Sequence, residues 1–264
     1  MKILAIGDIH GRDFWKSPVK RYLKKVDKVI FLGDYCDPYQ DEGEIYTWKD
    51  TANNFNEIIE LKRNNMDKVI LLLGNHDGHY YNKYFDDLAR STRFDDFHAV
   101  ELRKMFNENA GLFQLCYIAE NNGKKLIFTH AGVTNHWLNL CKIENDDNLE
   151  ANINELKNSD EGFSKLAIIG RERTWFGEKT GSPLWCDVRE FMRDKGLGDN
   201  IYQIFGHTRC EKGKFIETDS FACLDSQCAF RINDKNKIKR IEDETVKTNE
   251  KQRAVQDSQD DKPQ

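Results

Sequence analysis

The stretch KILAIGDIHG, residues 2–11, places an apolar run directly before a polar turn. The run has the length and composition of a strand that is buried on both faces, and Asp8 and His10 follow it at once. Apolar runs at 28–32, 68–73, 125–128 and 201–205 also precede short polar motifs. The five motifs in chain order are Gly7-Asp8-Ile9-His10-Gly11, Gly33-Asp34-Tyr35-Cys36-Asp37, Gly74-Asn75-His76-Asp77, Thr129-His130-Ala131-Gly132 and Gly206-His207-Thr208. Ligand-type residues after five strands in series predict one shared site.

The order of these strands predicts an α/β fold with the site at one edge of a sheet. Ligand-type side chains that follow the carboxyl ends of several buried strands converge at that edge, where open α/β sheets bind ligands. Between the second and third strands, Trp48, Ala52, Phe55 and Ile59 recur at helical spacing. The pattern predicts a helix with one face on the sheet, and hence a βαβ unit.

Composition restricts the class of protein. The chain has 264 residues, 39% of them hydrophobic and 32% charged, and no apolar run approaches the ~20 residues that span a bilayer. We therefore expect a cytoplasmic protein without a membrane partner. The seven cysteines contain no Cys-x-x-Cys pair, which favours reduced thiols over a disulfide framework or a zinc ribbon. The net charge of −5 provides no basic field for a phosphate backbone and argues against a nucleic-acid partner.

The spacing of apolar residues outlines the rest of the chain. Residues 1–242 are predicted to form one domain, and 243–264 a disordered tail with too few apolar side chains to offset the cost of ordering. Within the domain, 86–109 is predicted to be helical and 112–118 to be a strand. An acidic, Asn-rich stretch at 139–164 has apolar residues at helical spacing, which predicts a helical cap insertion over the motif edge of the sheet.

The motif residues have the chemistry of a two-metal centre that hydrolyses phosphate esters. Two divalent cations ~3.5–4 Å apart clamp the phosphate oxygens and acidify a bound water, and such a pair needs one shared ligand. We predict that Asp8 and His10 face the first ion, and that Asp34, with two carboxylate oxygens, bridges the pair. The predicted neutral ligands of the second ion are Asn75, His130 and His207. This mixture of ligands favours Mn²⁺, with Fe or Zn²⁺ as alternatives.

Over roughly residues 1–232, the motif series resembles that of the calcineurin-like metallophosphoesterases. It is most similar to their branch of phosphoprotein phosphatases and diadenosine tetraphosphatases. The resemblance implies an α/β/β/α sandwich of two mixed sheets, with the dinuclear site at the carboxyl ends of the strands. It implies the same metal ligands, with His76 protonating the leaving-group oxygen and Asp37 orienting His76. The expected reaction is direct attack of an activated water on phosphorus, since no Cys or Asp nucleophile motif is placed for a covalent intermediate.

At two positions the chain differs from the motifs of the family, and these differences bear on the expected substrate. Relatives that hydrolyse cyclic nucleotides or DNA usually carry a further metal-ligand histidine where this chain has Arg209, which weakens both of those functions. Pro38 stands where the phosphatase branch has a phosphate-binding arginine. We predict that Arg171 or Arg173 replaces it, because a guanidinium matches two phosphate oxygens. Both precede residues 184–187, Leu-Trp-Cys-Asp, which resemble a Leu-Trp-Ser-Asp segment of the same branch.

Polar residues outside the motifs are predicted to be structural. His79, His98 and His136 have no motif around them, and surface or hydrogen-bonded positions are expected for them. Asp225 is expected to be structural near the closing strand.

Three functions of different classes follow from this chemistry. The first is a phosphomonoesterase that acts on phosphoserine or phosphothreonine in proteins. The second is a hydrolase of dinucleoside polyphosphates or other nucleotides, favoured by the small size and the predicted cap. The third is a non-catalytic binding module that keeps the metal scaffold. The expected partner is thus a phosphorylated substrate, either a phosphoprotein or a nucleotide.

Overall fold

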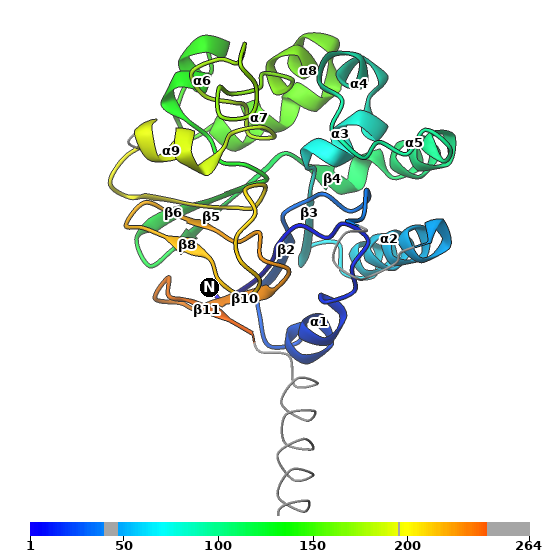
Figure 1. Cartoon of the computed structure of the whole chain (residues 1–264). Helices are drawn as coiled ribbons and strands as arrows, with labels where there is room; N and C mark the ends of the chain where they lie inside the picture. Colours follow the sequence, from blue (N-terminus) through cyan, green and yellow to red (C-terminus); the bar gives the residue numbers. More distant parts are fainter. Residues whose placement is uncertain (40–46, 195, 242–264) are drawn as a thin grey trace, which may run out of the picture.

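The computed structural model describes residues 1–39, 47–194 and 196–241, and two packed β-sheets form its centre (Figure 1). The strands of sheet A are β1 (Ile3–Ile6), β2 (Lys28–Phe31), β3 (Val69–Leu72), β4 (Phe113–Gln114), β10 (Ala229–Ile232) and β11 (Ile238–Arg240). Their order across the sheet is β11-β10-β1-β2-β3-β4. The first four strands of the chain run parallel, and β10 pairs antiparallel with β1.

Sheet B contains the later strands. They are β5 (Cys116–Asn121), β6 (Lys124–Thr129), β7 (Ile201–Phe205), β8 (Ile216–Glu217) and β9 (Phe221–Cys223). Their order is β5-β6-β7-β9-β8. Asn122 and Gly123 connect β5 to β6 with φ of 50° and 72°, as a two-residue hairpin turn with left-handed backbone requires. The five strands predicted ahead of the motifs correspond to β1, β2, β3, β6 and β7.

Helices cover the outer faces of both sheets. They are α1 (Lys16–Tyr22), α2 (Trp48–Arg63), α3 (Asn75–Tyr81), α4 (Lys83–Ala89), α5 (Ala99–Glu108), α6 (Asn135–Cys141), α7 (Leu149–Glu155), α8 (Asp160–Leu166) and α9 (Val188–Asp194). Along β1, Ile3 and Ala5 pack between the sheets, while Leu4 and Ile6 face the helices. This confirms the predicted α/β/β/α sandwich.

The predicted helix before the third motif is α2. Thr47 caps its first turn, because the Thr47 side chain accepts from the amide of Asp50 while the Asp50 carboxylate accepts from the amide of Thr47. Phe55 and Ile59 are buried against sheet A, as the periodicity predicts. The βαβ unit is therefore present.

The stretch predicted to be helical, 86–109, is helical only in part. Two helices, α4 and α5, lie there, and residues 90–98 between them are not helical. Arg93 has a φ of 63°, which no helix accommodates, and the Asp95 carboxylate accepts from the amides of Phe97 and His98. A side chain that satisfies local amides offers the backbone an alternative to the helix.

The continuous strand predicted over 112–118 is wrong, because the chain changes sheets at Leu115. Residues 113–114 belong to β4 in sheet A and 116–121 to β5 in sheet B. The amides of Leu115 and Cys116 both donate to the side chain of Asn154, at 2.7 Å and 3.1 Å. A partner 39 residues away in the sequence thus holds the crossover.

The stretch 139–164 is largely helical, as expected, and consists mainly of the end of α6, α7 and the beginning of α8. Its helices pack beside β5, where Glu150 accepts from the amide of Ile118 and Asn154 from Leu115 and Cys116. A role as a cap over the site stays a prediction. The predicted tail at 243–264 lies outside the described residues.

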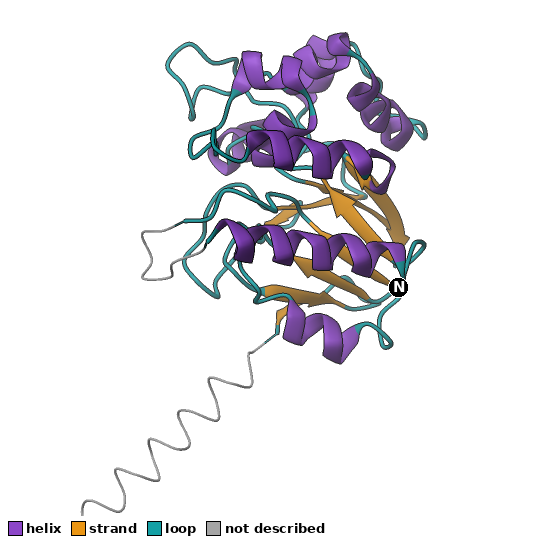
Figure 2. Cartoon of the chain, turned by 90° about the vertical axis from the view of Figure 1, so that its right-hand side faces the viewer, coloured by secondary structure: helices purple, strands orange, loops and turns teal. Residues whose placement is uncertain are grey.

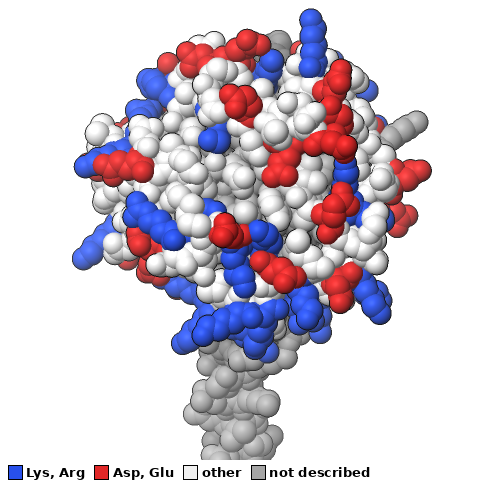
Figure 3. Space-filling view, turned by 180° about the vertical axis from the view of Figure 1, so that it is seen from behind, with Lys and Arg blue, Asp and Glu red and all other residues white. Residues whose placement is uncertain are grey.

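The surface carries charges of both signs. On the face opposite to the view of Figure 1, acidic and basic side chains are interspersed, and the basic ones gather at the lower end (Figure 3). Within the described part of the chain, no helix combines the length and the apolar character that a membrane crossing requires.

Candidate metal centre

Loops gather at the side of the two sheets that lies away from the amino terminus (Figure 2). The motif residues follow the carboxyl ends of β1, β2, β3, β6 and β7. Four residues of these loops have left-handed backbone: φ is 46° at His10, 53° at Asp34, 56° at Asp37 and 63° at His207. Such a conformation is uncommon for residues other than glycine and is enriched at functional sites, where the surrounding structure stabilises it. The backbone of these loops therefore fixes the direction of particular side chains, in addition to connecting the elements.

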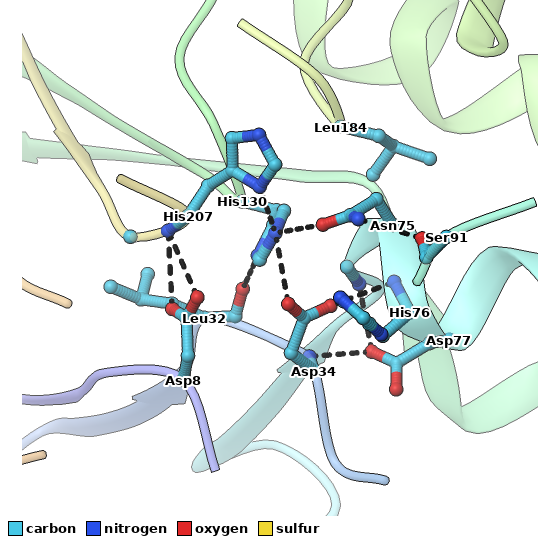
Figure 4. Close-up of polar contacts among 12 residues, drawn as sticks. Asp8, Leu32, Asp34, Asn75, His76, Asp77, Ser91, His130, Leu184 and His207 are labelled. Carbon is cyan, nitrogen blue, oxygen red and sulfur yellow. Dashed lines mark hydrogen bonds and ion pairs between the residues drawn. The ribbon is translucent and has the colours of Figure 1, made fainter. Parts of the chain in front are cut away.

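Asp77 ties the second motif to the third. Its carboxylate accepts from the amides of Asp34 at 2.7 Å, Tyr35 at 2.8 Å and Gly74 at 2.8 Å. Gly74 must be a glycine, because a Cβ there would stand 2.1 Å from Oδ1 of Asp34. Asp34 in turn accepts from the amide of His76 at 2.9 Å, so both of its carboxylate oxygens have fixed positions (Figure 4).

The first half of the centre contains Asp8, His10 and Asp34, whose ligand atoms lie within 4.8 Å of one another. Nδ1 of His10 lies 3.1 Å from the Cys36 carbonyl and 3.0 Å from the Asp37 carbonyl, and these acceptors assign the proton to Nδ1. The lone pair of Nε2 then points toward Oδ2 of Asp34, 3.4 Å away. Two electron-rich atoms that face each other fit a cation between them.

The second half has the same arrangement around His130. Its Nδ1 lies 2.8 Å from the Leu32 carbonyl, so Nδ1 donates and Nε2 is free to act as a ligand. Nε2 lies 3.0 Å from Oδ1 of Asn75, 3.2 Å from Nδ1 of His207 and 3.5 Å from Oδ2 of Asp34. Four ligand atoms from four motifs thus converge, and Asp34 is common to both halves (Figure 4).

The electrostatics of the ligands also fit divalent cations. Burial raises the pKa of Asp8, and the neighbouring carboxylates of Asp225 and Asp34 raise it further. Burial likewise raises the pKa of Asp34, with Asp77 as the next cause. Burial lowers the pKa of His130 to about 3, which keeps that imidazole neutral. Buried carboxylates that repel one another, beside neutral imidazoles, form a site that positive charge stabilises.

His76 and Asp37 lie beside the ligands. Nδ1 of His76 donates to Oδ2 of Asp37 at 2.8 Å, and both side chains are buried. Burial raises the pKa of Asp37, but hydrogen bonds from His76 and His79 outweigh it, so the pKa of this carboxyl is lowered. Asp37 is therefore ionised and holds His76 in a single orientation. This is the geometry expected of an oriented imidazole acid.

Two further partners of Asp37 were missed by the sequence analysis. Tyr80 donates to Oδ1 of Asp37 at 2.6 Å, and Nε2 of His79 lies 2.9 Å from Oδ2. His79 is fully buried in α3, in agreement with the structural position predicted for it. Its spacing of three from His76 on one helix was the available signal.

Asp225 lies closer to the centre than its expected structural position suggested. It is buried and shares a hydrogen bond with the Asp8 carboxyl. Burial raises the pKa of Asp225 to about 6, although the charges of Arg12 and Arg209 lower it. Arg209 thus brings positive charge to the neighbourhood in which relatives carry a further histidine.

The two predicted substrate arginines differ in position. Arg173 donates to the His207 carbonyl at 3.3 Å and to Oγ1 of Thr208 at 3.1 Å, and its guanidinium pairs with Asp187 at 3.2 Å. It therefore lies beside the second half of the centre. Arg171 is exposed and donates within its own loop, to the Gly177 carbonyl at 3.4 Å.

Residues 1–211 match the model of the calcineurin-like phosphoesterase family. The chain belongs to this family. Members of the calcineurin-like family use a dinuclear metal centre, so the protein is a metal-dependent hydrolase of phosphoester bonds with a phosphorylated substrate. The fold and the ligand groups described above agree with that assignment.

Solved structures that match this chain include a phosphatase, a phosphoesterase and a phosphodiesterase. A serine/threonine phosphatase from Saccharomyces cerevisiae, described as similar to human PP5, is 15% identical, with a TM-score of 0.49 over 92% of this chain and 80% of its own. The E. coli phosphoesterase YfcE is 12% identical, with a TM-score of 0.39 over 91% and 98%. An archaeal phosphodiesterase is 15% identical, with a TM-score of 0.38 over 91% and 99%. A search of curated proteins finds no match.

Proposed function

We propose that this phosphoesterase is a phosphomonoesterase of the serine/threonine protein phosphatase type. The observation that supports it most directly is that Asp34 is shared by two ligand groups while the His76–Asp37 pair lies beside them. These groups offer ligand atoms for two ions, with the His76 imidazole at their side. The phosphatase branch has this combination in its motifs, and residues 184–187 resemble a segment of the same branch.

Each predicted residue has a definite task in this proposal. Asp8 and His10 would hold one ion, Asn75, His130 and His207 the other, and Asp34 both. When bound, the ions supply charge neutralisation at the phosphate oxygens and an acidified water. Mn²⁺ is the proposed metal, because carboxylate, amide and imidazole donors together suit it.

His76 would deliver a proton to the departing oxygen. Its Nδ1 proton is committed to Asp37, so the mobile proton is the one carried at Nε2 when the ring is protonated. Burial lowers the pKa of His76, and Arg93 lowers it further, while the hydrogen bond to Asp37 opposes both. A lowered pKa makes the imidazolium a stronger acid toward a poor leaving group.

Arg173 and Arg171 remain the proposed substrate contacts, and their support is unequal. Arg173 has the contacts to His207 and Thr208 in its favour. For Arg171, the sequence pattern alone supports the role. We also propose that residues 1–242 form one domain, in which 139–164 is an insertion.

One observation favours nucleotide hydrolysis as a second candidate. Trp175 and Phe176 follow Arg173 two and three residues later, and their exposed fractions are 97% and 100%. Exposed aromatic rings next to a phosphate-binding arginine suit a nucleobase, because every base has a face that can stack.

The deciding experiment compares two substrates. Mn²⁺-loaded protein is given a phosphothreonine peptide or diadenosine tetraphosphate, and phosphate release or nucleotide products are measured. His76→Asn is the background control and is expected to lower turnover by roughly a hundredfold or more at unchanged metal content. His98→Asn is the matched control, because His98 stacks on Trp48 away from the ligands.

Preference for the peptide supports the proposal. Preference for the dinucleotide contradicts the proposal and favours nucleotide hydrolysis instead. Trp175 and Phe176 would then be the next residues to mutate. Full activity of His76→Asn on the better substrate refutes the acid role.

A further inference from the structure

Arg93 occupies the site from a segment that no motif includes. It lies between α4 and α5, and its Nη2 is 3.3 Å from Nε2 of His76, the atom proposed to carry the mobile proton. Its Nε donates to the Asp37 carbonyl at 3.4 Å. Its guanidinium carbon lies 3.6 Å from the centre of the Tyr39 ring. Arg93 is thus held on three sides, against the His76–Asp37 pair.

The charge of Arg93 distinguishes it from its neighbours. Arg90 and Arg103 both form ion pairs with the buried carboxylate of Asp86, at 2.6 Å and 2.7 Å. Of the residues described, none offers Arg93 a carboxylate within ion-pair distance; its contacts are a carbonyl, an imidazole and an aromatic ring. Arg93 is also exposed, whereas His76 beneath it is buried. An accessible cation at the rim of a buried site attracts anions.

The backbone agrees with a functional position. Arg93 has a φ of 63°, in the left-handed region shared by His10, Asp34, Asp37 and His207. Such a conformation costs free energy in a residue with a Cβ, and Arg93 adopts it in the non-helical segment between α4 and α5. From this segment its side chain reaches His76.

Tyr39 links Arg93 to the metal ligands. Its ring packs edge-on against the His10 ring at 4.7 Å between centroids, while the Arg93 guanidinium covers it. A guanidinium stacked on an aromatic ring keeps its N–H groups directed outward in its plane. The fork is therefore preorganised between the first half of the centre and His76.

We propose that Arg93 binds the non-bridging oxygens of the phosphoryl group under attack and selects dianionic phosphomonoesters over phosphodiesters. The inference rests on the proposed phosphomonoesterase function. Arg93 would supply the guanidinium that the family has at the position of Pro38, from a segment more than fifty residues further along the chain. Nη2 of Arg93 lies 3.3 Å from Nε2 of His76, so a phosphate oxygen beside His76 lies within reach of the guanidinium fork.

The preference for monoesters follows from charge. A monoester at neutral pH carries a second negative charge that a diester lacks. The Arg93 guanidinium attracts the dianion more strongly than the monoanion, because the Coulomb energy grows with the charge of the anion. Removal of Arg93 therefore penalises monoesters more than diesters.

The test uses three variants of the full-length protein loaded with Mn²⁺. Arg93→Met removes the charge, Arg93→Lys keeps the charge without the fork, and Arg90→Met removes a neighbouring arginine that pairs with Asp86. We compare kcat/KM for p-nitrophenyl phosphate and bis(p-nitrophenyl) phosphate, and titrate inorganic phosphate by calorimetry. Metal content is measured for every sample.

Arg93→Met is expected to lower kcat/KM for the monoester roughly 10- to 100-fold and to weaken phosphate binding about tenfold or more. The diester rate should stay within about threefold, with Arg93→Lys intermediate and Arg90→Met like the wild type.

Unchanged phosphate affinity in Arg93→Met overturns the inference. Equal losses on both esters also overturn it and assign Arg93 to the orientation of His76. If the wild type hydrolyses neither ester, the proposed function fails, and calorimetry alone then decides whether Arg93 binds the anion.

Discussion

The ligand cluster and the rim around it are built in different ways. The ligand cluster, defined as the six predicted metal ligands with His76 and Asp37, comes entirely from the five motifs at strand ends. The rim, defined as Tyr39, Arg93, Arg171 and Arg173, comes from the segments between motifs. The cluster is mostly buried, whereas the three arginines of the rim are exposed. Arg93 nevertheless contacts His76, and Arg173 contacts Thr208.

This difference shows which parts of the site tolerate change. A metal ligand must hold one atom in place relative to several others. This requirement also constrains the backbone, as the left-handed φ of Asp34 and the close approach of Gly74 to Asp34 show. A rim residue must only bring charge to a given region, which a long side chain from another segment also achieves. Under the proposal for Arg93, a guanidinium from another segment would serve in place of the arginine that is missing at Pro38.

The largest effect expected in the ligand cluster is that of Asp34→Asn. The neutral amide cannot bridge two cations, so turnover should fall on the order of 10⁴-fold or more. Elemental analysis should find at most one ion per chain, against two in the wild type. Melting curves of both proteins without metal serve as the control for folding, and two retained ions would exclude the bridging role.

Metal binding should stabilise the ligand cluster more at pH 7.5 than at pH 5.5. Asp225 and Asp77 have folded pKa values of about 6 and about 7, above the ordinary 3.8. The folded state thus binds more protons than the unfolded state, and this contribution to stability is lost as pH rises through those values. Bound cations replace the protons and remove that loss.

We expect Mn²⁺ at a hundred times its Kd to add about 2.7 kcal/mol at the higher pH, or roughly 5–10 °C in Tm. Thermal melts with and without Mn²⁺ at both pH values measure the difference. If Mn²⁺ raised the Tm more at pH 5.5 than at pH 7.5, the role given to Asp225 and Asp77 in this pH dependence would be wrong.

Gly206→Ala should disturb the ligand cluster, although Gly206 is not itself a predicted ligand. A Cβ at Gly206 would stand 2.0 Å from Oδ1 of Asp8, so the carboxylate must move. We expect a loss of about 1–3 kcal/mol in the free energy of unfolding, together with weaker metal binding. Gly111→Ala is the matched control, because a Cβ there meets no atom within 4 Å. Equal stability of the two variants would show that Asp8 has freedom that the structure does not suggest.

The smallest effect is expected at the rim. Arg173→Met should lower kcat/KM about tenfold, because a charge-assisted contact is lost while the metal ligands stay in place. Arg171→Met is the matched comparison and should change it less than about threefold. A steady-state assay on the preferred substrate separates the two, and equal losses would give both arginines the same role.

That the residues of the ligand cluster lie together could be predicted from the sequence, because the information needed is local. Each ligand follows an apolar run whose pattern alone predicts a buried strand. Parallel strands then bring their carboxyl ends together at one edge of the sheet. Asp8 and Asp34, for example, follow β1 and β2, which are neighbours in sheet A.

What the sequence did not predict depends on particular side-chain hydrogen bonds, some of them local and some between distant residues. The crossover at Leu115 relies on Asn154, and the break before α5 relies on local turn bonds of Asp95 and on Tyr80, which accepts from the Asp95 amide. The position of Arg93 follows from that break. Apolar periodicity predicts which face of an element is buried. It does not predict which side chain will accept a hydrogen bond from a given backbone amide.

The pairing of β1 with β10 has a consequence for how the chain is made. β1 is a central strand of sheet A, yet one of its neighbours, β10, ends at Ile232, far beyond the last predicted ligand, His207. During synthesis, the strand that carries Asp8 must wait for almost the whole described chain before its sheet is complete. Until then its edge amides are open to other chains, so expression at low temperature or with a chaperone present should raise the soluble yield, as fractionation of the lysate can measure.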